Sequence, residues 1–210
     1  MNEAAKKPQL RATVFSDYVC PFCYVGDVRL NRLRADYDLR VNWCFVEIHP
    51  ETPPDGQPVE TLGYAPEQWT RMMAALKTLA GEEGLRLVPP IRVANSHRAL
   101  LLAEAAKEEG AERFYRLHRR LFEAYLSEGE NIADPTVLER LAEEAALPPG
   151  FTASAWREPR FEKRLVHNRA AARELAITAT PTIFIGERRL TGAVAAEEFR
   201  EAARMARPDH

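Results

Sequence analysis

Long apolar runs, a sizeable net charge and a second paired-cysteine motif are all missing from this chain of 210 residues. No segment approaches the roughly twenty apolar residues that a membrane-spanning helix needs, so the sequence predicts no membrane span. The net charge is −2, with 29 basic against 31 acidic residues, which gives no reason to expect nucleic acid or an anionic membrane as a partner. No repeat or low-complexity tract appears, and a hydrophobic content of 46% is ample for a globular core.

Cysteine is scarce, with only Cys20, Cys23 and Cys44 in the chain. The number is odd, and residues 1–10 contain no apolar core of a signal peptide, so we expect a reducing compartment, the cytoplasm, in which any disulfide is catalytic. A structural zinc site needs four ligands and usually a second spaced pair of cysteines. Because the remaining candidates are Cys44 and five scattered histidines, we expect no bound metal.

The chain is organised around Cys20-Pro21-Phe22-Cys23, which falls where a strand pattern ends and a helix pattern begins. Residues 10–15 alternate and are rich in β-formers, whereas apolar residues after the motif recur at steps of three and four. Cys20 is therefore expected at the N-terminus of a helix, with Pro21 in the first turn, where its missing N–H costs nothing. Unpaired N–H groups and the positive end of the helix dipole should stabilise a thiolate there.

A second thiol one helical turn later gives this site the parts of a redox pair. The Cys20 thiolate can attack a disulfide, and Cys23 can attack back to form a short intrachain disulfide. Half of a zinc site and two inert buried cysteines are the alternatives. The missing second pair of ligands disfavours the zinc site, and the strand-to-helix context disfavours inert cysteines. Cys44 lies inside a predicted strand, so we expect it to be a small packing residue.

Strand patterns occur at both ends of the chain. Residues 39–48 form a β-rich run that is apolar on both faces towards its end, as in a central strand, and they complete a βαβ unit with the first strand and helix. Strand character returns at 182–185 and 189–191, and a closing helix is predicted over 195–205. Elements from the two ends must therefore pair in one sheet.

Helical patterns fill the middle of the chain after a proline-rich loop. We predict a discontinuous α/β core, residues 1–60 and 166–210, interrupted by an all-helical insertion over 61–165. On the helix that Pro66 opens, Met72 and Met73 are expected to face the core, and His118 is expected to be a satisfied core histidine.

Thr180-Pro181 precedes the returning strand, where a proline removes a backbone donor and needs a reason. If the bond is cis, the chain turns sharply and leaves neighbouring backbone groups free to pair with an extended substrate beside the thiols. If the bond is trans, Pro181 merely starts a strand. Taken alone, the residues favour the trans form, because only about one X–Pro bond in twenty is cis.

Taken together, these motifs resemble the DsbA-type thioredoxin fold and, more narrowly, the FrnE-like dithiol oxidoreductases of bacterial cytoplasm. The segments that carry the resemblance are 15–26, Asn95-Ser96 with Ala99-Leu100, 176–184 and 190–193. The resemblance implies a thioredoxin-like core with an inserted all-helical subdomain, and thiol–disulfide exchange that needs no metal or nucleotide.

By the same resemblance, Cys20 is the nucleophile, Cys23 the resolving thiol, and Pro181 is cis beside them. Pro21, Phe22, Thr180 and Pro181 are expected to contact the substrate, which is a protein or a small molecule carrying a dithiol or a disulfide.

The chain departs from the strongly oxidising members at Phe22, where they carry histidine, so no imidazole helps to hold the Cys20 thiolate and a weaker oxidant is expected. Phe22 offers an apolar face either to substrate or only to its neighbours. Asp17 is expected to satisfy local backbone N–H groups rather than to take part in catalysis.

Two other functions fit the same architecture. It is similar to that of 2-hydroxychromene-2-carboxylate isomerases and kappa-class glutathione transferases, which activate glutathione with a serine where Cys20 stands. Glutathione is therefore a candidate co-substrate near Thr180 and Pro181. A thiol-dependent chaperone or binding module that uses the insertion as a hydrophobic surface is the other alternative. The physiological substrate, the direction of electron flow and the oligomeric state stay open.

Overall fold

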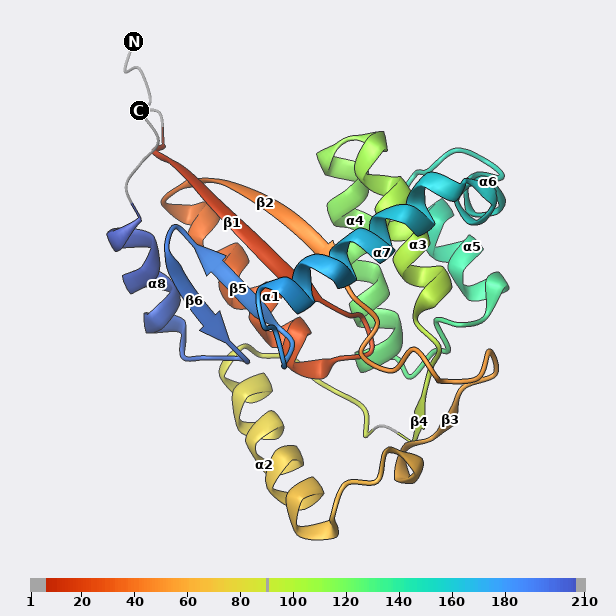
Figure 1. Cartoon of the computed structure of the whole chain (residues 1–210), viewed down its shortest axis with the longest axis horizontal. Helices are drawn as coiled ribbons and strands as arrows, with labels where there is room; N and C mark the ends of the chain where they lie inside the picture. The colour runs from red at the N-terminus through yellow and green to blue at the C-terminus, as the bar shows by residue number, and fades with distance from the viewer. Residues whose placement is uncertain (1–6, 90, 207–210) are drawn as a thin grey trace.

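The structure is a computed structural model that describes residues 7–89 and 91–206 (Figure 1). At its centre is a four-stranded sheet with the strand order β2-β1-β5-β6. The strands are β1 (Gln9–Ser16), β2 (Asp38–Phe45), β5 (Thr182–Ile185) and β6 (Arg188–Thr191). β1 and β2 are parallel and are joined by helix α1 (Pro21–Arg32), which confirms the predicted βαβ unit, and the other neighbours are antiparallel.

Helices cover both faces of this sheet. On one face, Leu10, Ala12 and Val14 of β1 belong to the main core together with residues of α1 and of α8 (Ala196–Met205). Phe15 points to the other face and packs with residues of α7 (Pro159–Glu174). The alternation of the strand therefore assigns its side chains to two different layers.

The place of β2 in the sheet differs from the prediction. Its apolar residues indicated a central strand, but β2 lies at the edge and β1 is central. Trp43 and Phe45 are nevertheless buried because their rings lie close to Phe114 of α4 (Ala111–Phe122), while Cys44 packs on the α7 side. Helices on both faces bury a strand whether or not it has a neighbour on each side.

The insertion between β2 and β5 is mostly helical. Besides α4 and α7 it contains α2 (Pro66–Glu82), α3 (His97–Ala106), α5 (Pro135–Glu144) and α6 (Phe151–Arg157). Short helical turns of the insertion lie at Val59–Leu62, Lys107–Glu109 and Glu123–Ser127, and another, Leu33–Ala35, follows α1. Among the described residues of the predicted all-helical segment 61–165, β4 (Arg92–Val93) is a strand, and it pairs in an antiparallel ribbon with β3 (Gln57–Pro58), which lies just before that segment. Helix α6 was not predicted, because only two of its seven residues are buried and the pattern is weak.

Helix α2 stands apart from the other helices of the insertion (Figure 1). Of its 17 residues only Leu76 and Ala80 are buried, and they form a small cluster with Val25 of α1. The N-terminal half of α2 buries no residue, so much of its apolar face is left for another role. Within residues 7–89 and 91–206, no helix combines the length and the apolar character needed to cross a membrane.

Candidate active site

Cys20 is the N-cap residue of α1, and Cys23 lies one turn into the helix. The backbone of Cys20 is extended, with φ −91° and ψ 110°, and Pro21 opens the helix. The Cys23 N–H donates a hydrogen bond to the Cys20 carbonyl oxygen at 3.0 Å. Both cysteines are free thiols, and Cys20 is 5% exposed and Cys23 2% exposed. The structure thus places the pair at the helix N-terminus that the sequence predicted.

The pKa values of the two thiols are shifted in opposite directions. A hydrogen bond with Cys23 is the main cause that lowers the pKa of Cys20, burial opposes it, and Thr180 and the Cys23 backbone N–H act in the lowering direction. Burial and the neighbouring Cys20 raise the pKa of Cys23 well above its ordinary value. The pair therefore consists of one thiol whose pKa lies below its ordinary value and one whose pKa lies above it.

The Thr180–Pro181 peptide bond is cis and lies beside the start of α1. Cys20 Sγ donates to the Thr180 carbonyl oxygen at 3.5 Å, which joins residues 160 positions apart. A Cβ added at Gly26 would lie 2.9 Å from Pro181 Cγ, so a glycine is needed for α1 to approach this loop. The Pro181 carbonyl oxygen accepts a hydrogen bond from the Gly192 N–H at 2.8 Å, which ties the loop to the end of β6.

Asp17 is fully buried behind the thiols and links the core to the insertion. Its carboxylate accepts hydrogen bonds from the Ile48 N–H at 2.9 Å, the Ser96 hydroxyl at 3.1 Å and the Val19 N–H at 3.4 Å. Burial raises the pKa of Asp17 to about 6 in spite of these donors. The predicted bond to a local N–H is confirmed, and the bonds to Ile48 and Ser96 extend it across the fold.

A groove of about 610 Å³ opens beside Cys20. Cys20, Pro21 and Phe22 line it at the start of α1, whereas Thr180 and Pro181 are not among its lining residues. Its other walls come from Ile48 and His49 and from residues within 55–89, 91–94 and 125–131, and they are largely apolar. They include Leu62, Tyr64, Trp69, Met72, Met73, Leu76, Val88 and Ile91.

The predicted core role of Met72 and Met73 is wrong in one respect. Both side chains are only half-buried and line the groove, although Met73 also packs at the edge of the cluster around Val25. A helical stripe that faces a groove has the same period as one that faces a core, so the sequence could not separate the two.

Arg29 is a residue of the site that sequence reasoning missed. It lies on α1, is 1% exposed, and its Nε and Nη2 donate to Glu83 at 2.8 Å and Glu82 at 2.6 Å. Its Nη1 donates to the carbonyl oxygens of Ala193 at 3.1 Å and Val194 at 2.5 Å. Arg29 therefore joins the C-terminal end of α2, whose earlier turns line the groove, to the loop after β6, and the Gly192 N–H of that loop bonds to the Pro181 carbonyl oxygen.

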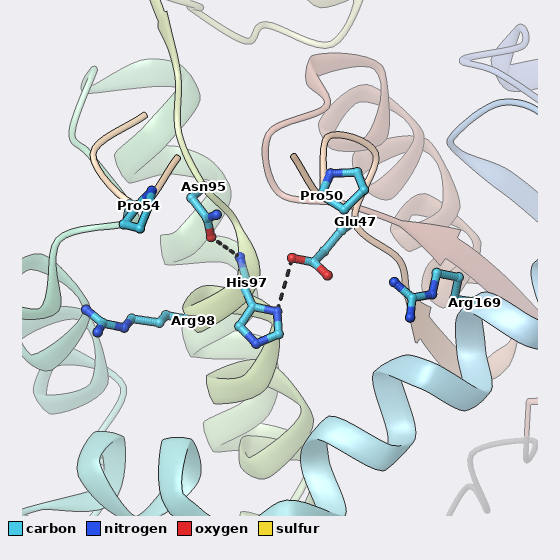
Figure 2. Close-up of a pocket in the computed structure, with 8 residues that line it drawn as sticks. Glu47, Pro50, Pro54, Asn95, His97, Arg98 and Arg169 are labelled. Atoms are coloured by element: carbon cyan, nitrogen blue, oxygen red, sulfur yellow. Dashed lines mark hydrogen bonds and ion pairs between the residues drawn. The ribbon is translucent and has the colours of Figure 1, made fainter. Parts of the chain in front are cut away.

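A second cavity, of about 360 Å³, lies where the core meets the insertion (Figure 2). Figure 2 shows Glu47 and His97 facing one another, with 3.0 Å between Oε1 and Nδ1. His97 Nε2 lies 3.1 Å from Glu162 of α7, and the hydrogen bond to Glu47 is the main cause that raises the pKa of His97. These paired charges fix α3 and α7 against the end of β2, and none of the three cysteines lines this cavity.

His118 and Cys44 are buried in the core, as predicted, and neither lines the groove. The expectation that His118 is a satisfied histidine holds only for Nδ1, because its buried Nε2 has no hydrogen-bond partner among the described residues. His118 Nδ1 lies 2.8 Å from Tyr18 Oη, and its Nε2 faces Asp27 at 3.4 Å within a cluster of aromatic rings. Burial raises the pKa of Cys44, which packs between β1 and α7. Both residues behave as parts of the core.

A dithiol at the start of a helix, beside a cis-proline loop and on a four-stranded sheet with a helical insertion, defines a protein of the thioredoxin fold. The chain belongs to the DSBA-like thioredoxin domain family, which it matches over residues 12–204. This confirms the family resemblance inferred from the sequence at the level of the DsbA-like fold.

Individual proteins agree with the family match. The chain is 28% identical over 193 residues to the uncharacterized protein YwbO of Bacillus subtilis strain 168, covering 90% of this chain and 93% of that protein. It is similar in fold to a probable DsbA oxidoreductase of Streptomyces coelicolor, with a TM-score of 0.81, 24% identity, and coverage of 96% of this chain and 93% of that one. It also resembles a 2-hydroxychromene-2-carboxylate isomerase, with a TM-score of 0.72, 18% identity, and coverage of 91% and 93%.

Proposed function

We propose that this protein catalyses thiol–disulfide exchange through Cys20 and Cys23. The observation that carries the proposal is the placement of two free thiols at the start of α1, with Cys20 Sγ 3.5 Å from the Thr180 carbonyl oxygen of the cis-proline loop. The lowered pKa of Cys20 and the raised pKa of Cys23 agree with it. The thiolate is the nucleophile in disulfide exchange, so the more acidic thiol at the helix N-terminus attacks first. Membership of the DSBA-like family supports the same reaction class.

In the reducing direction, the Cys20 thiolate attacks one sulfur of a substrate disulfide. A mixed disulfide forms and the first substrate thiolate leaves. Cys23 then loses its proton and attacks Cys20 Sγ, which forms the Cys20–Cys23 disulfide and releases the second thiolate. Two electrons pass from the protein to the substrate, and the reverse sequence oxidises a substrate dithiol.

We extend the proposal to the residues that contact the substrate, the co-substrate and the compartment. Pro21 and Phe22 contact the substrate from the groove, and Thr180 and Pro181 contact it from the other side of Cys20. The reaction needs no metal or nucleotide, glutathione is a candidate co-substrate, and the protein works in the cytoplasm. The apolar Phe22 in place of histidine makes it a weaker oxidant than the strongly oxidising members.

A redox titration against mixtures of reduced and oxidised glutathione tests the proposal. In a Cys44→Ser background, alkylation followed by mass measurement should show a reversible two-electron transition between dithiol and Cys20–Cys23 disulfide. Cys23→Ser should instead stop at a mixed disulfide between glutathione and Cys20. Failure to form the Cys20–Cys23 disulfide at any ratio would refute exchange by this pair.

The alternatives have signatures of their own. A Cys20→Ser variant that keeps glutathione-dependent isomerase or transferase turnover would favour the isomerase type of function. Suppression of aggregation by a variant that lacks both Cys20 and Cys23 would favour the chaperone or binding module.

A further inference from the structure

The attacking thiol is nearly buried and opens onto the groove. Cys20 is 5% exposed and lines the groove. A thiolate attacks a disulfide along the axis of its two sulfurs, so the disulfide must enter the groove to meet Sγ. The flat surface of a folded protein does not fit such a site, whereas a small molecule or a flexible segment does.

Charged side chains of the groove lining are either exposed or held in an ion pair. Arg92 is exposed and donates to the Asp55 and Gly56 carbonyl oxygens at 3.1 and 3.0 Å, and Glu130 is paired with Arg140. Burial lowers the pKa of His49, which favours its neutral form, and Asp55 lies at an exposed position. A charged ligand that lies against the apolar walls would lose hydration and gain few partners in return.

Helix α2 gives the groove an apolar and adaptable wall. The ring centroids of Trp69 and Tyr64 lie 6.0 Å apart, and Met72 and Met73 follow Trp69 along the same helix. Aromatic rings and thioethers pack well against apolar groups of varied shape. The volume of about 610 Å³ lies in the range of small-molecule sites, about 300–1,000 Å³.

We propose that this groove selects an uncharged, apolar disulfide of low molecular weight as the substrate of Cys20. The inference rests on the proposed exchange function and narrows its substrate class. As the substrate S–S bond breaks, a bond forms between Cys20 Sγ and one substrate sulfur, and the first apolar thiolate leaves and takes up a proton from water. Cys23 releases its proton to solvent and displaces the second thiolate, so the substrate is reduced by two electrons to two thiols and the protein dithiol is oxidised.

A pair of matched disulfides tests this selection. Dithiodipropionic acid and its dimethyl ester share the same disulfide but differ in charge. The rate at which each compound oxidises the reduced protein in a single turnover is measured in the Cys44→Ser background. Dividing this rate by the rate of the same compound with mercaptoethanol corrects for the intrinsic reactivity of its disulfide. We expect the ester to be favoured by at least about tenfold, which corresponds to about 1.4 kcal/mol.

Two substitutions on α2 localise the effect. Met72→Glu places a carboxylate in the groove wall and should slow the ester by at least about fivefold. Ala75→Glu adds the same charge at an exposed position that does not line the groove, and it should leave the ester rate unchanged. Alkylation of Cys20 by iodoacetamide should be equal in both variants, which shows that the thiolate itself is intact.

The outcomes separate the two proposals. If no disulfide oxidises Cys20 and Cys23, the exchange function fails. If exchange occurs but the acid, oxidised glutathione or the disulfide of an unfolded protein reacts as fast as the ester or faster after normalisation, the exchange function stands and the apolar small-molecule substrate is overturned. Equal ester rates in Met72→Glu and the parent would also overturn it.

Discussion

Replacing Arg29 with methionine removes a buried guanidinium that makes hydrogen bonds to two carboxylates and two carbonyl oxygens. The Glu83 side chain is 1% exposed, so its charge would stay buried with Arg32 as its remaining partner. Removing one member of a buried ion pair costs about 3–5 kcal/mol, and the contact with Arg32 places this case at the lower end, about 3 kcal/mol. For a chain of this size each kcal/mol lowers Tm by about 2–4 °C, so we expect a fall of about 6–12 °C.

Urea unfolding followed by circular dichroism, together with thermal unfolding, measures this loss. Arg32→Met is the matched control, because its side chain is 50% exposed and shares the same carboxylate, and it should cost less than about 1 kcal/mol. Arg29 also anchors the end of α2, so hydrogen exchange in α2 should speed up more than exchange in β1. A loss below about 1 kcal/mol with unchanged protection of α2 would refute the role assigned to Arg29.

Three further changes address the titrating groups. Cys23→Ala removes the thiol that hydrogen-bonds to Cys20 and should raise the pKa of Cys20, with Cys23→Ser in between because it keeps a donor. The pH dependence of iodoacetamide alkylation measures this, and identical titrations would contradict the assigned cause. Because burial raises the pKa of Asp17 from 3.8 to about 6, the stability linked to its proton is present below about pH 4 and lost as the pH rises through about 6. Relative to Asp17→Asn, the free energy of unfolding of the parent, measured with urea, should therefore fall by about 3 kcal/mol between about pH 4 and pH 6. Parallel curves of stability against pH for the two proteins would contradict this role of Asp17. The pKa of His97 is also raised, so His97 stabilises the fold fully below about pH 6.5, and this stability is lost as the pH rises through the raised pKa. His97→Gln should lower the free energy of unfolding by less than about 1 kcal/mol at pH 6, because the ring is partly exposed and screened by solvent, and should not change it at about pH 9. Calorimetry at the two pH values measures this, and an equal loss at both would exclude the ion pairs as the cause.

Local features of the site were determined by the sequence itself. The border between β1 and α1 is encoded in a change of apolar period from two to about 3.6, and Pro21 marks the first turn directly after Cys20. These signals depend on residues close together in the chain, so they need no knowledge of the tertiary structure. The same is true of the strands at the two ends, whose patterns predicted a sheet built from distant segments.

The surroundings of the thiols were decided only by the tertiary structure. Periodicity shows that one face of α2 is apolar, but it does not show whether a core or a groove lies against that face, so Met72 and Met73 were misassigned. Burial on both faces likewise does not give the order of strands, and β2 proved to be an edge strand.

Arg29 shows the same limit for a polar residue. Three residues after Gly26, it lies near the apolar stripe of the predicted helix, which is a weak sign of burial. Its partners Glu83 and Val194 are 54 and 165 positions away, and no local pattern encodes such pairs. A sequence determines which residues prefer to be buried and where helices begin, because those preferences act between near neighbours. Which buried charges meet, and which apolar face stays open to a ligand, depends on contacts that exist only once the chain has folded.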